Sequence, residues 1–560
     1  AGATLGTRAG AQGHTAIGRG GWLRALSVLP EHATIGANEQ WRGVPATQAG
    51  RCPAVSDVDA SDVRFRPEVH GALSLVLNGA LDLVAGLPLW LLVAVGLQSP
   101  SVTPEAVEAW LRAATWSPLV VLSIAAAIVA ADVARVVLLA LMVRLLPRGV
   151  AGIQAGVVSR WGATMLVVSA GDRLLQRASV RLSGTLFWPS WLRLAGMQIG
   201  RDSEVSTIID VVPSLVRIGA GCFFADGVYL GGPSQRSGTA TLGVVACGPG
   251  TFLGNHAVIR PGTTLPRGAL VGICTVADAQ LPGLAAALDA ERATMTPTDA
   301  AWFGHPALQL PRREHVTADR ALTHEPTLIR RINRLFWEAL RFALPLVPWG
   351  VATLGVALLL AANSVPSAST RHLIAIPGAL LITALVPCLL TVALKWGLLG
   401  RSRAGQHPLW SCWCSRWDFL YVAWAAWATP IVQVLEGSLL LNLWLRAMGV
   451  RIGRRVYLGS GAAQVVDPDM LVLGDGATVN GLFQAHTFED RVLKTAPVYV
   501  RDGATLAAGA VLMMGGDIGA GSLVTPHSVV MKGERLGAGR VYGGCPVRRV
   551  EEGQMTTLNS

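Results

Sequence analysis

Aliphatic residues recur at every sixth position near the C-terminal end of the chain. The series runs through Val500, Leu506, Leu512, Ile518, Val524, Val530 and Leu536. Small residues stand two positions before most of them, at Ala504, Ala510, Gly516, Ser522 and Ser528. A six-residue period is typical of a parallel β-helix, in which each coil has three short faces and one bulky residue per face points inward. The pattern therefore predicts a β-helix of short parallel strands.

The same period occurs twice more along the chain. In the middle it runs through Leu253, Ile259, Leu265 and Val271, and near the N-terminus through Leu5, Ala11, Ile17, Leu23, Leu29 and Ile35. Each series is followed by an aromatic-x-Gly-x-Pro-small motif, at 41–46, 302–307 and 542–547. We therefore predict three β-helix domains, at 1–50, 195–312 and 449–552. Because the first series starts with the first residues, we expect the first domain to lack its beginning.

Long apolar stretches separate these domains. They cover 73–97 and 118–146 before the second domain, and 342–362 and 373–399 before the third. A helix needs about 20 apolar residues to cross a bilayer, so we predict transmembrane pairs at 73–146 and 342–399. The Trp-rich segments 152–194 and 417–445 lead into the second and third domains, and we expect interfacial helices there. A further membrane span is the alternative for 417–445.

Composition supports this mixed architecture. The 560 residues are 51% hydrophobic and 14% charged, well below the roughly 25% charged residues of soluble domains. With 63 Gly and 31 Pro, the chain is also unlike a simple bundle of membrane helices. The predicted fold class is a membrane protein in which transmembrane α-helix pairs alternate with three left-handed parallel β-helix domains.

The net charge of +11 comes almost entirely from arginine, since Lys395, Lys494 and Lys532 are the only lysines. Such a charge suits nucleic acid, but arginines concentrate in the segments that flank the predicted membrane pairs, which favours the positive-inside rule. We therefore expect a multi-pass protein of the cell membrane with its β-helix domains on the cytoplasmic side, and no nucleic-acid partner. Inside the apolar stretches, Asp132 and Arg135 are one helical turn apart and are predicted to pair; Asp82 and Lys395 are further candidates for function or for snorkelling.

The best candidate for chemistry is an insertion at 480–494 that interrupts the last series of hexads. Its His486 can take a proton from an attacking amine or hydroxyl near neutral pH. Glu489 or Asp490 is predicted to orient the histidine ring and to stabilise the imidazolium. Candidates for substrate binding are Asn480, Gln484, Arg491 and Lys494. The alternative is a surface loop whose polar residues only cap the coils.

A metal site is not expected. The eight cysteines are scattered without a CxxC pair, which argues against zinc and against a disulfide framework. The three histidines His256, His486 and His527 lack the close pairing that a β-helix metal site needs.

The motifs Trp302-Phe303-Gly304-x-Pro306-Ala307 and Gln484-Ala485-His486-Thr487-Phe488-Glu489-Asp490-Arg491-Val492 carry a family resemblance. The chain resembles the membrane-bound C-terminal region of nonribosomal peptide synthetases of the ε-poly-lysine synthetase (Pls/PosA) type. The resemblance implies an enzyme that forms amide bonds between amino acids, making a homopoly-amino-acid or a short peptide. The donor would be an amino-acyl thioester on a phosphopantetheinyl carrier, with no cofactor bound directly.

It also implies adenylation and carrier domains, either upstream in a full-length chain or in a separate protein. Over 486–546 the chain is similar to maltose and galactoside acetyltransferases, in which a catalytic His precedes the final hexads. The second domain has Pro233-Ser234-Gln235 in the comparable insertion and no His. Such enzymes are trimers with sites between subunits, so we expect the three domains to form an intramolecular pseudo-trimer. Two alternatives stay open: a membrane-associated acetyltransferase that uses acyl-CoA on a sugar or amine, and a non-catalytic scaffold for a synthetase.

Overall fold

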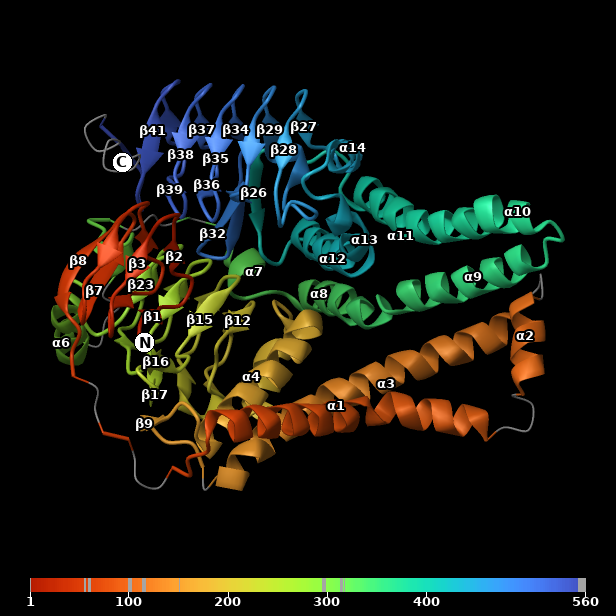
Figure 1. Cartoon of the computed structure of the whole chain (residues 1–560), viewed down its shortest axis with the longest axis horizontal. Coiled ribbons are helices and arrows are strands. Elements are labelled where there is room, and N and C mark those ends of the chain that lie inside the picture. The colour runs from red at the N-terminus through yellow and green to blue at the C-terminus, as the bar shows by residue number, and fades with distance from the viewer. Residues whose placement is uncertain are drawn as a thin grey trace.

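A computed structural model describes residues 2–54, 57–58, 62–98, 103–112, 117–150, 152–294, 299–312, 316 and 318–551. Three stacks of short strands lie together at one end of the molecule, and two pairs of long helices extend away from them (Figure 1). We call the stacks the first domain (2–52), the second domain (197–310) and the third domain (450–550). Glu552, with which the predicted third domain ends, lies outside the described residues.

Strands within each domain pair in parallel with strands about three hexads further along the chain. Thr4 pairs with Trp22, Val258 with Val276 and Thr505 with Leu523, so a regular coil takes eighteen residues. Coils that carry an insertion are longer, as where Phe223 pairs with Phe252. Each domain contains three such sheets, which correspond to the three faces of a coil. This arrangement agrees with β-helix-like repeats, as the six-residue period predicts.

The strands are short, and most have two or three residues. The first domain comprises β1 (Thr4–Leu5), β2 (Gly10–Ala11), β3 (Ala16–Ile17), β4 (Trp22–Leu23), β5 (Val28–Leu29), β6 (Thr34–Ile35), β7 (Glu39–Gly43) and β8 (Ala46–Arg51). The second comprises β10 (Gln198–Ile199), β11 (Glu204–Val205), β12 (Ile208–Ile209), β13 (Val216–Ile218), β14 (Phe223–Phe224), β15 (Val228–Leu230), β18 (Val245–Cys247), β19 (Phe252–Leu253), β20 (Val258–Ile259), β21 (Thr264–Leu265), β22 (Leu270–Val271), β23 (Val276–Ala277), β24 (Ala301–Phe303) and β25 (Leu308–Gln309). The third comprises β27 (Arg451–Ile452), β28 (Tyr457–Leu458), β29 (Leu471–Leu473), β30 (Thr478–Val479), β31 (Leu482–Gln484), β34 (Val498–Val500), β35 (Thr505–Leu506), β36 (Val511–Met513), β37 (Asp517–Ile518), β38 (Leu523–Val524), β39 (Val529–Val530), β40 (Arg535–Leu536), β41 (Val541–Gly543) and β42 (Arg548–Arg549).

The hexad positions form the core of the second and third stacks; in the first stack the series is buried from Leu23 onward, while Leu5 is exposed. In the third domain the central members of the series are completely buried, namely Leu506, Leu512, Ile518, Val524 and Val530. The turns between faces need small residues because neighbouring coils approach closely. At Gly519, for example, an added Cβ would lie 2.6 Å from the backbone nitrogen of Ala538 in the next coil.

The three domains contact one another through their terminating motifs. The backbone N–H of His305 donates to the carbonyl of Cys545 at 2.9 Å. A Cβ on Gly43 would meet Pro306 at 3.5 Å, and one on Gly544 would meet the carbonyl of Val44 at 3.5 Å. A shared apolar cluster joins Leu26, Cys274 and Cys545, one residue from each domain. The three motifs therefore meet in the interior, each against the other two.

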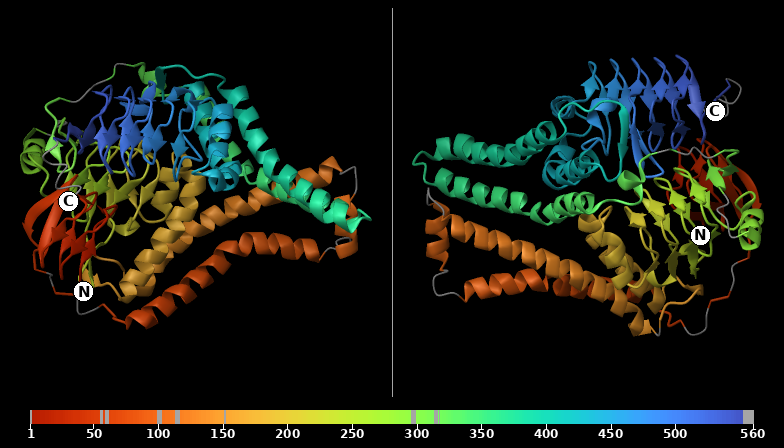
Figure 2. Two further views of the ribbon diagram at one scale, coloured as in Figure 1. Left: turned by 45° about the horizontal axis from the view of Figure 1, so that its top comes forward. Right: turned by 180° about the vertical axis from the view of Figure 1, so that it is seen from behind.

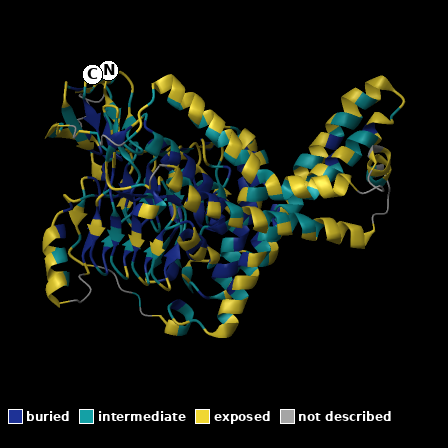
Figure 3. Cartoon of the chain, turned by 90° about the horizontal axis from the view of Figure 1, so that it is seen from below, coloured by how far each residue is buried: buried dark blue, intermediate teal, exposed yellow. Residues whose placement is uncertain are grey.

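Four helices are long and apolar enough to cross a membrane, among the residues that the structure describes. They are α1 (Pro67–Leu97) and α3 (Pro118–Leu145), and α9 (Leu346–Asn363) and α11 (Ile376–Leu398), with the short helices α2 (Pro104–Arg112) and α10 (Ala368–Thr370) at the turns. Both pairs project from the same side of the domains (Figures 1 and 2). Many residues of these helices are exposed (Figure 3), including Leu75 and Leu119 at 76–77%. Such a surface is stable in lipid and not in water, which indicates membrane association.

The remaining helices connect these pairs to the domains. They are α4 (Ala163–Leu182), α5 (Phe187–Leu194), α6 (Leu284–Thr294), α7 (Arg320–Thr323), α8 (Leu328–Leu340), α12 (Cys412–Trp427), α13 (Thr429–Val432) and α14 (Leu439–Met448). Helices α4 and α5 bury Leu174, Leu175 and Trp188 in the core of the second domain. Helix α12 and the following helical segment Thr429–Leu435 make an angle of 48° with each other. If the two crossed the membrane together, they would form a fifth span.

The predicted Asp132–Arg135 pair is wrong. Asp132 instead pairs with Arg181 of α4 at 3.4 Å, because α4 packs against α3 and brings its arginines beside that helix. Asp82 contacts Arg177 and Arg173, also on α4. Lys395 is buried and pairs with Asp469 of the third domain at 3.0 Å. These charges lie where the helix pairs meet the domains.

The inward hexad positions should dominate the stability of the third domain. Replacing Leu512 with Ala removes a fully buried side chain, and such changes lower the free energy of unfolding by about 2–5 kcal/mol. Leu523→Ala, at an outward position of the same stack that is 37% exposed, is the matched control. We expect a clear drop in the apparent melting temperature of the detergent-solubilised protein for Leu512→Ala only. Equal shifts for the two variants would contradict the assignment of inward and outward faces.

Candidate functional site

The insertion at 480–494 folds into a hairpin that leaves the regular coils. It consists of β32 (His486–Glu489) and β33 (Val492–Thr495), and β26 (Gly405–Pro408) extends it to a three-stranded antiparallel sheet. His486 opens the hairpin opposite Thr495 and is 8% exposed. Strand β31 of the third domain leads directly into the hairpin, so the position of His486 is fixed by the coil to which β31 belongs.

His486 is held by a carboxylate from the preceding coil. Its Nδ1 lies 2.6 Å from Oδ2 of Asp467, which is itself buried. The other oxygen of Asp467 accepts a hydrogen bond from the indole N–H of Trp417 on α12 at 2.8 Å. The Trp417 ring also meets the imidazole edge-on, with 5.2 Å between ring centroids. Since Nδ1 is engaged, Nε2 is the ring atom left to exchange a proton with a substrate.

This geometry corrects the prediction that Glu489 or Asp490 orients the histidine. Glu489 instead contacts Lys494 at 2.5 Å and also Lys532, while Asp490 faces His324 at 3.4 Å. His486 is the first residue of β32 and Glu489 the last, so the length of the strand separates this carboxylate from the histidine ring. Burial alone raises the pKa of the Glu489 carboxyl, but the hydrogen bonds from the two lysines outweigh it and hold that pKa below its usual range.

The predicted substrate-binding residues separate into different places. Gln484 accepts a hydrogen bond from Asn255 of the second domain at 2.9 Å and lines the cavity described below. Asn480 lies in a turn, where its amide oxygen occupies the space above Gly459 of the neighbouring coil. Arg491 is buried and donates to the carbonyl of Asp202, and Lys494 pairs with Glu489. Gln484 therefore faces the cavity, whereas Asn480 and Arg491 serve the packing of the coils and domains.

A cavity of about 350 Å³ lies between the second and third domains and is closed on one side by α8 and α12. His486 lines it together with Glu489 and Lys532. Much of its wall is aromatic, with Phe223 and Phe252 from the second domain, Phe488 from the hairpin and Trp337 and Trp417 from the helices. Asp226 of the second domain contributes a carboxylate, which accepts hydrogen bonds from Ser206 and Thr207. The site thus has an apolar body with a few polar groups, as small-molecule sites usually do.

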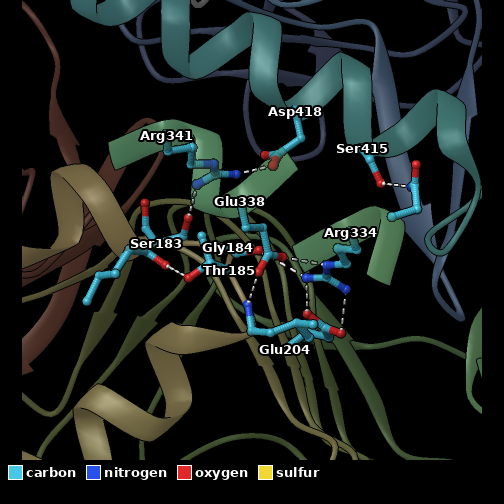
Figure 4. Close-up of polar contacts among 12 residues, drawn as sticks. Ser183, Gly184, Thr185, Glu204, Arg334, Glu338, Arg341, Ser415 and Asp418 are labelled. Carbon is cyan, nitrogen blue, oxygen red and sulfur yellow. Dashed lines mark hydrogen bonds and ion pairs between the residues drawn. The ribbon is translucent and has the colours of Figure 1, made fainter. Parts of the chain in front are cut away.

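A buried ion network supports the floor of this cavity (Figure 4). Arg334 of α8 makes a bidentate contact with Glu204 of the second domain, at 2.8 and 2.9 Å, and a third contact with Glu338 at 2.7 Å. Glu338 in turn accepts from the backbone N–H of Leu186 at 2.8 Å. Arg341 bonds the carbonyl of Ser183 and also Asp418 of α12. The network fixes α8, which leads into the second helix pair, against the second domain.

Sequence reasoning missed Asp467 and the residues of this network. Asp467 lies 19 positions before His486, in the segment Val466-Asp467-Pro468-Asp469. Two acidic residues on either side of a proline, within a region of hexads, were a sequence signal that could have identified it. Glu204, Arg334 and Asn255 carried no local pattern. In the described part of the chain, no group of three His, Cys, Asp or Glu side chains could hold a metal ion.

The fold and the site define a class of protein: three β-helix-like domains with apolar helix pairs and a histidine in a cavity between domains. Comparison with known proteins adds to this description. No protein-family model matches the chain. It is 30% identical to delta-poly-L-ornithine synthetase of Acinetobacter baumannii (strain AB307-0294) over 375 residues. The match covers 65% of this chain and 27% of that relative, so the chain spans about a quarter of the relative's length. The chain is therefore related to poly-amino-acid synthetases.

The buried network should respond strongly to the loss of its cation. In Arg334→Ala the carboxylates of Glu204 and Glu338 stay buried without their partner, and breaking a buried pair costs about 3–5 kcal/mol. Arg320→Ala is the matched control, because Arg320 and its partner Glu325 are 68% and 66% exposed and such pairs contribute little. We expect a lower apparent melting temperature for Arg334→Ala and an unchanged one for Arg320→Ala. An unchanged value for both would show that the network does not hold α8 in place.

Proposed function

We propose that this chain is the membrane-bound, amide-forming region of a poly-amino-acid synthetase. The observation that carries the proposal is the Asp467–His486 pair at the edge of an apolar cavity between two domains. The relation to delta-poly-L-ornithine synthetase supports the product class, an amide-linked chain of amino acids. The exposed apolar helices support a membrane-bound enzyme.

In the proposed reaction an amine of the acceptor attacks the carbonyl carbon of an amino-acyl thioester. Nε2 of His486 accepts the proton of the amine as the C–N bond forms, and Asp467 stabilises the resulting imidazolium. The C–S bond then breaks, and the proton passes to the thiolate that leaves. Backbone N–H groups of the adjoining coils are the proposed donors to the developing oxyanion. No atom is oxidised or reduced, so the reaction needs no redox cofactor.

The cavity walls suit these substrates. The aromatic side chains can cover the apolar arm of a phosphopantetheinyl carrier, which we propose as the form in which the donor arrives. Asp226 can attract a cationic amino acid or the end of a growing cationic chain. In this proposal the adenylation and carrier domains act from elsewhere in a longer chain or from a separate protein.

The proposal also assigns the arrangement of the domains. Each stack is taken as a left-handed β-helix of the hexapeptide acyltransferase type, and the three form a pseudo-trimer inside one chain. The meeting of the three terminating motifs supports this, because such a contact is expected around a pseudo-threefold axis. The positive-inside rule places the domains on the cytoplasmic side of the cell membrane.

Two other functions make different predictions. An acetyltransferase that uses acyl-CoA on a sugar or amine would employ the same histidine and would accept a free CoA thioester in place of a carrier-bound one. A scaffold that only docks a synthetase would not need His486 at all. The carboxylate-held histidine in a cavity favours catalysis over the scaffold.

Amide formation by membranes that contain the full-length protein, supplied with amino-acyl carrier protein, tests the proposal. We expect His486→Ala to lower the rate by about 10²–10⁴, the range of general-base catalysis, and Asp467→Asn to lower it as well because the ring loses its orienting carboxylate. His32→Ala, an exposed histidine of the first domain, is the matched control and should be unchanged.

Membrane expression and melting temperature must be equal for all variants. Full activity of His486→Ala would refute a catalytic role for this residue and favour the scaffold. Product formed from free acyl-CoA but not from the carrier would favour the acetyltransferase.

A further inference from the structure

The interface between the first and second domains contains a cluster of arginines. The guanidinium groups of Arg24, Arg236 and Arg260 lie 5.1–5.6 Å from the ring centroid of Trp22. Arg42, on β7, lines a cavity of about 90 Å³ together with Arg24 and Arg260. Two of the four arginines come from the first domain and two from the second, so the cluster exists only when the domains are assembled.

This interface is the counterpart of the one that holds His486. In the second domain β16 (Ser234–Arg236) and β17 (Thr239–Leu242) form a hairpin that β9 (Gly156–Ser159) extends, as β26 extends the hairpin of the third domain. Ser234 pairs with Thr241 as Thr487 pairs with Lys494, so Pro233 stands where His486 stands in the third domain. The two interfaces therefore have the same construction but different chemistry.

The cavity walls differ in the same systematic way. Leu230 pairs with Ile259 as Phe483 pairs with Leu512. In this alignment of the two domains, Arg260 occupies the position of Met513, and Asp278 that of Met531. Both methionines line the apolar cavity near His486. Arg260 and Asp278 line the smaller cavity. The wall that is apolar at the interface with His486 is therefore charged at the interface between the first and second domains.

The charges in this cluster do not balance among the described residues. Three guanidinium groups, those of Arg24, Arg42 and Arg260, line the cavity with one carboxylate, that of Asp278, which pairs with Arg24 at 2.9 Å. The fourth arginine, Arg236, donates to the carbonyl of Pro53. Arg260 donates only to the hydroxyl of Ser234, at 3.0 Å. His305 lines the cavity too, but burial and the nearby arginines lower its pKa to about 4, so it is neutral at neutral pH. Burial and Arg24 also lower the pKa of Arg260, which reflects the cost of holding these cations together.

We propose that this arginine cavity binds the phosphate or diphosphate group of a water-soluble ligand. A guanidinium group matches the geometry of phosphate oxygens and binds them with paired hydrogen bonds, and an anion here would offset the uncompensated positive charge. The first domain lies at the end of the molecule opposite the tips of the helix pairs (Figure 1), so a soluble ligand fits better than a lipid headgroup. The site is separate from the His486 cavity and does not depend on the function proposed for it.

Calorimetric titration of the detergent-solubilised chain with inorganic phosphate and with pyrophosphate, at constant ionic strength, tests the site. Arg42 is exposed and has no role in the core, so Arg42→Gln should fold normally. We expect Arg42→Gln and Arg260→Gln each to weaken binding about tenfold or more, since a hydrogen bond between charged groups is lost. Arg217→Gln, an exposed arginine of β13, is the matched control and should bind like the wild type.

Tighter binding of pyrophosphate than of phosphate would identify a diphosphate-bearing ligand, and equal binding a single phosphate group. The proposal is overturned if neither anion binds the wild type. It is also overturned if all four proteins bind alike, because the anions would then respond only to the net positive charge of the chain.

Discussion

The packing of one coil on the next is the constraint on which the rest of this structure depends. In the regular coils a short strand buries one bulky side chain, and its neighbours in the same sheet lie eighteen residues away, as Leu506 and Val524 do. A single coil cannot exclude water from its inward face, so coils must stack before any of them is stable. The stacked domains are then rigid enough to present loops at fixed positions. The hairpin that carries His486 has such a position because β31 belongs to the stack.

The candidate site of this chain lies between domains and not within one. The His486 cavity needs the third domain for its histidine and its Asp467, the second domain for Phe223, Phe252 and Asp226, and helices α8 and α12 for closure. The buried contacts of Arg334 with Glu204 and Glu338 tie the helix before the second membrane pair to this assembly. The helices on either side of the second apolar pair thereby contribute to the shape of the site.

Repetition has allowed the two domain interfaces to diverge. The same hairpin occurs beside both, but one interface holds a carboxylate-supported histidine in an apolar cavity and the other holds three arginines around a tryptophan. A covalent arrangement of three related domains permits this difference, whereas identical subunits would give identical interfaces.

The sequence by itself determined the repeats, the two apolar helix pairs, the terminating motifs and the position of the insertion that carries His486. These features are local. A six-residue period or a long apolar run can be recognised from the sequence because it involves residues that are neighbours in the chain. Only the tertiary structure decided which carboxylate orients the histidine, because Asp467 reaches it from the preceding coil while the nearer Glu489 points to the lysines. The same holds for Asp132, which pairs with Arg181 of another helix instead of with Arg135. Pairings of this kind depend on how coils and helices are placed in space, and spacing along the chain does not encode that placement.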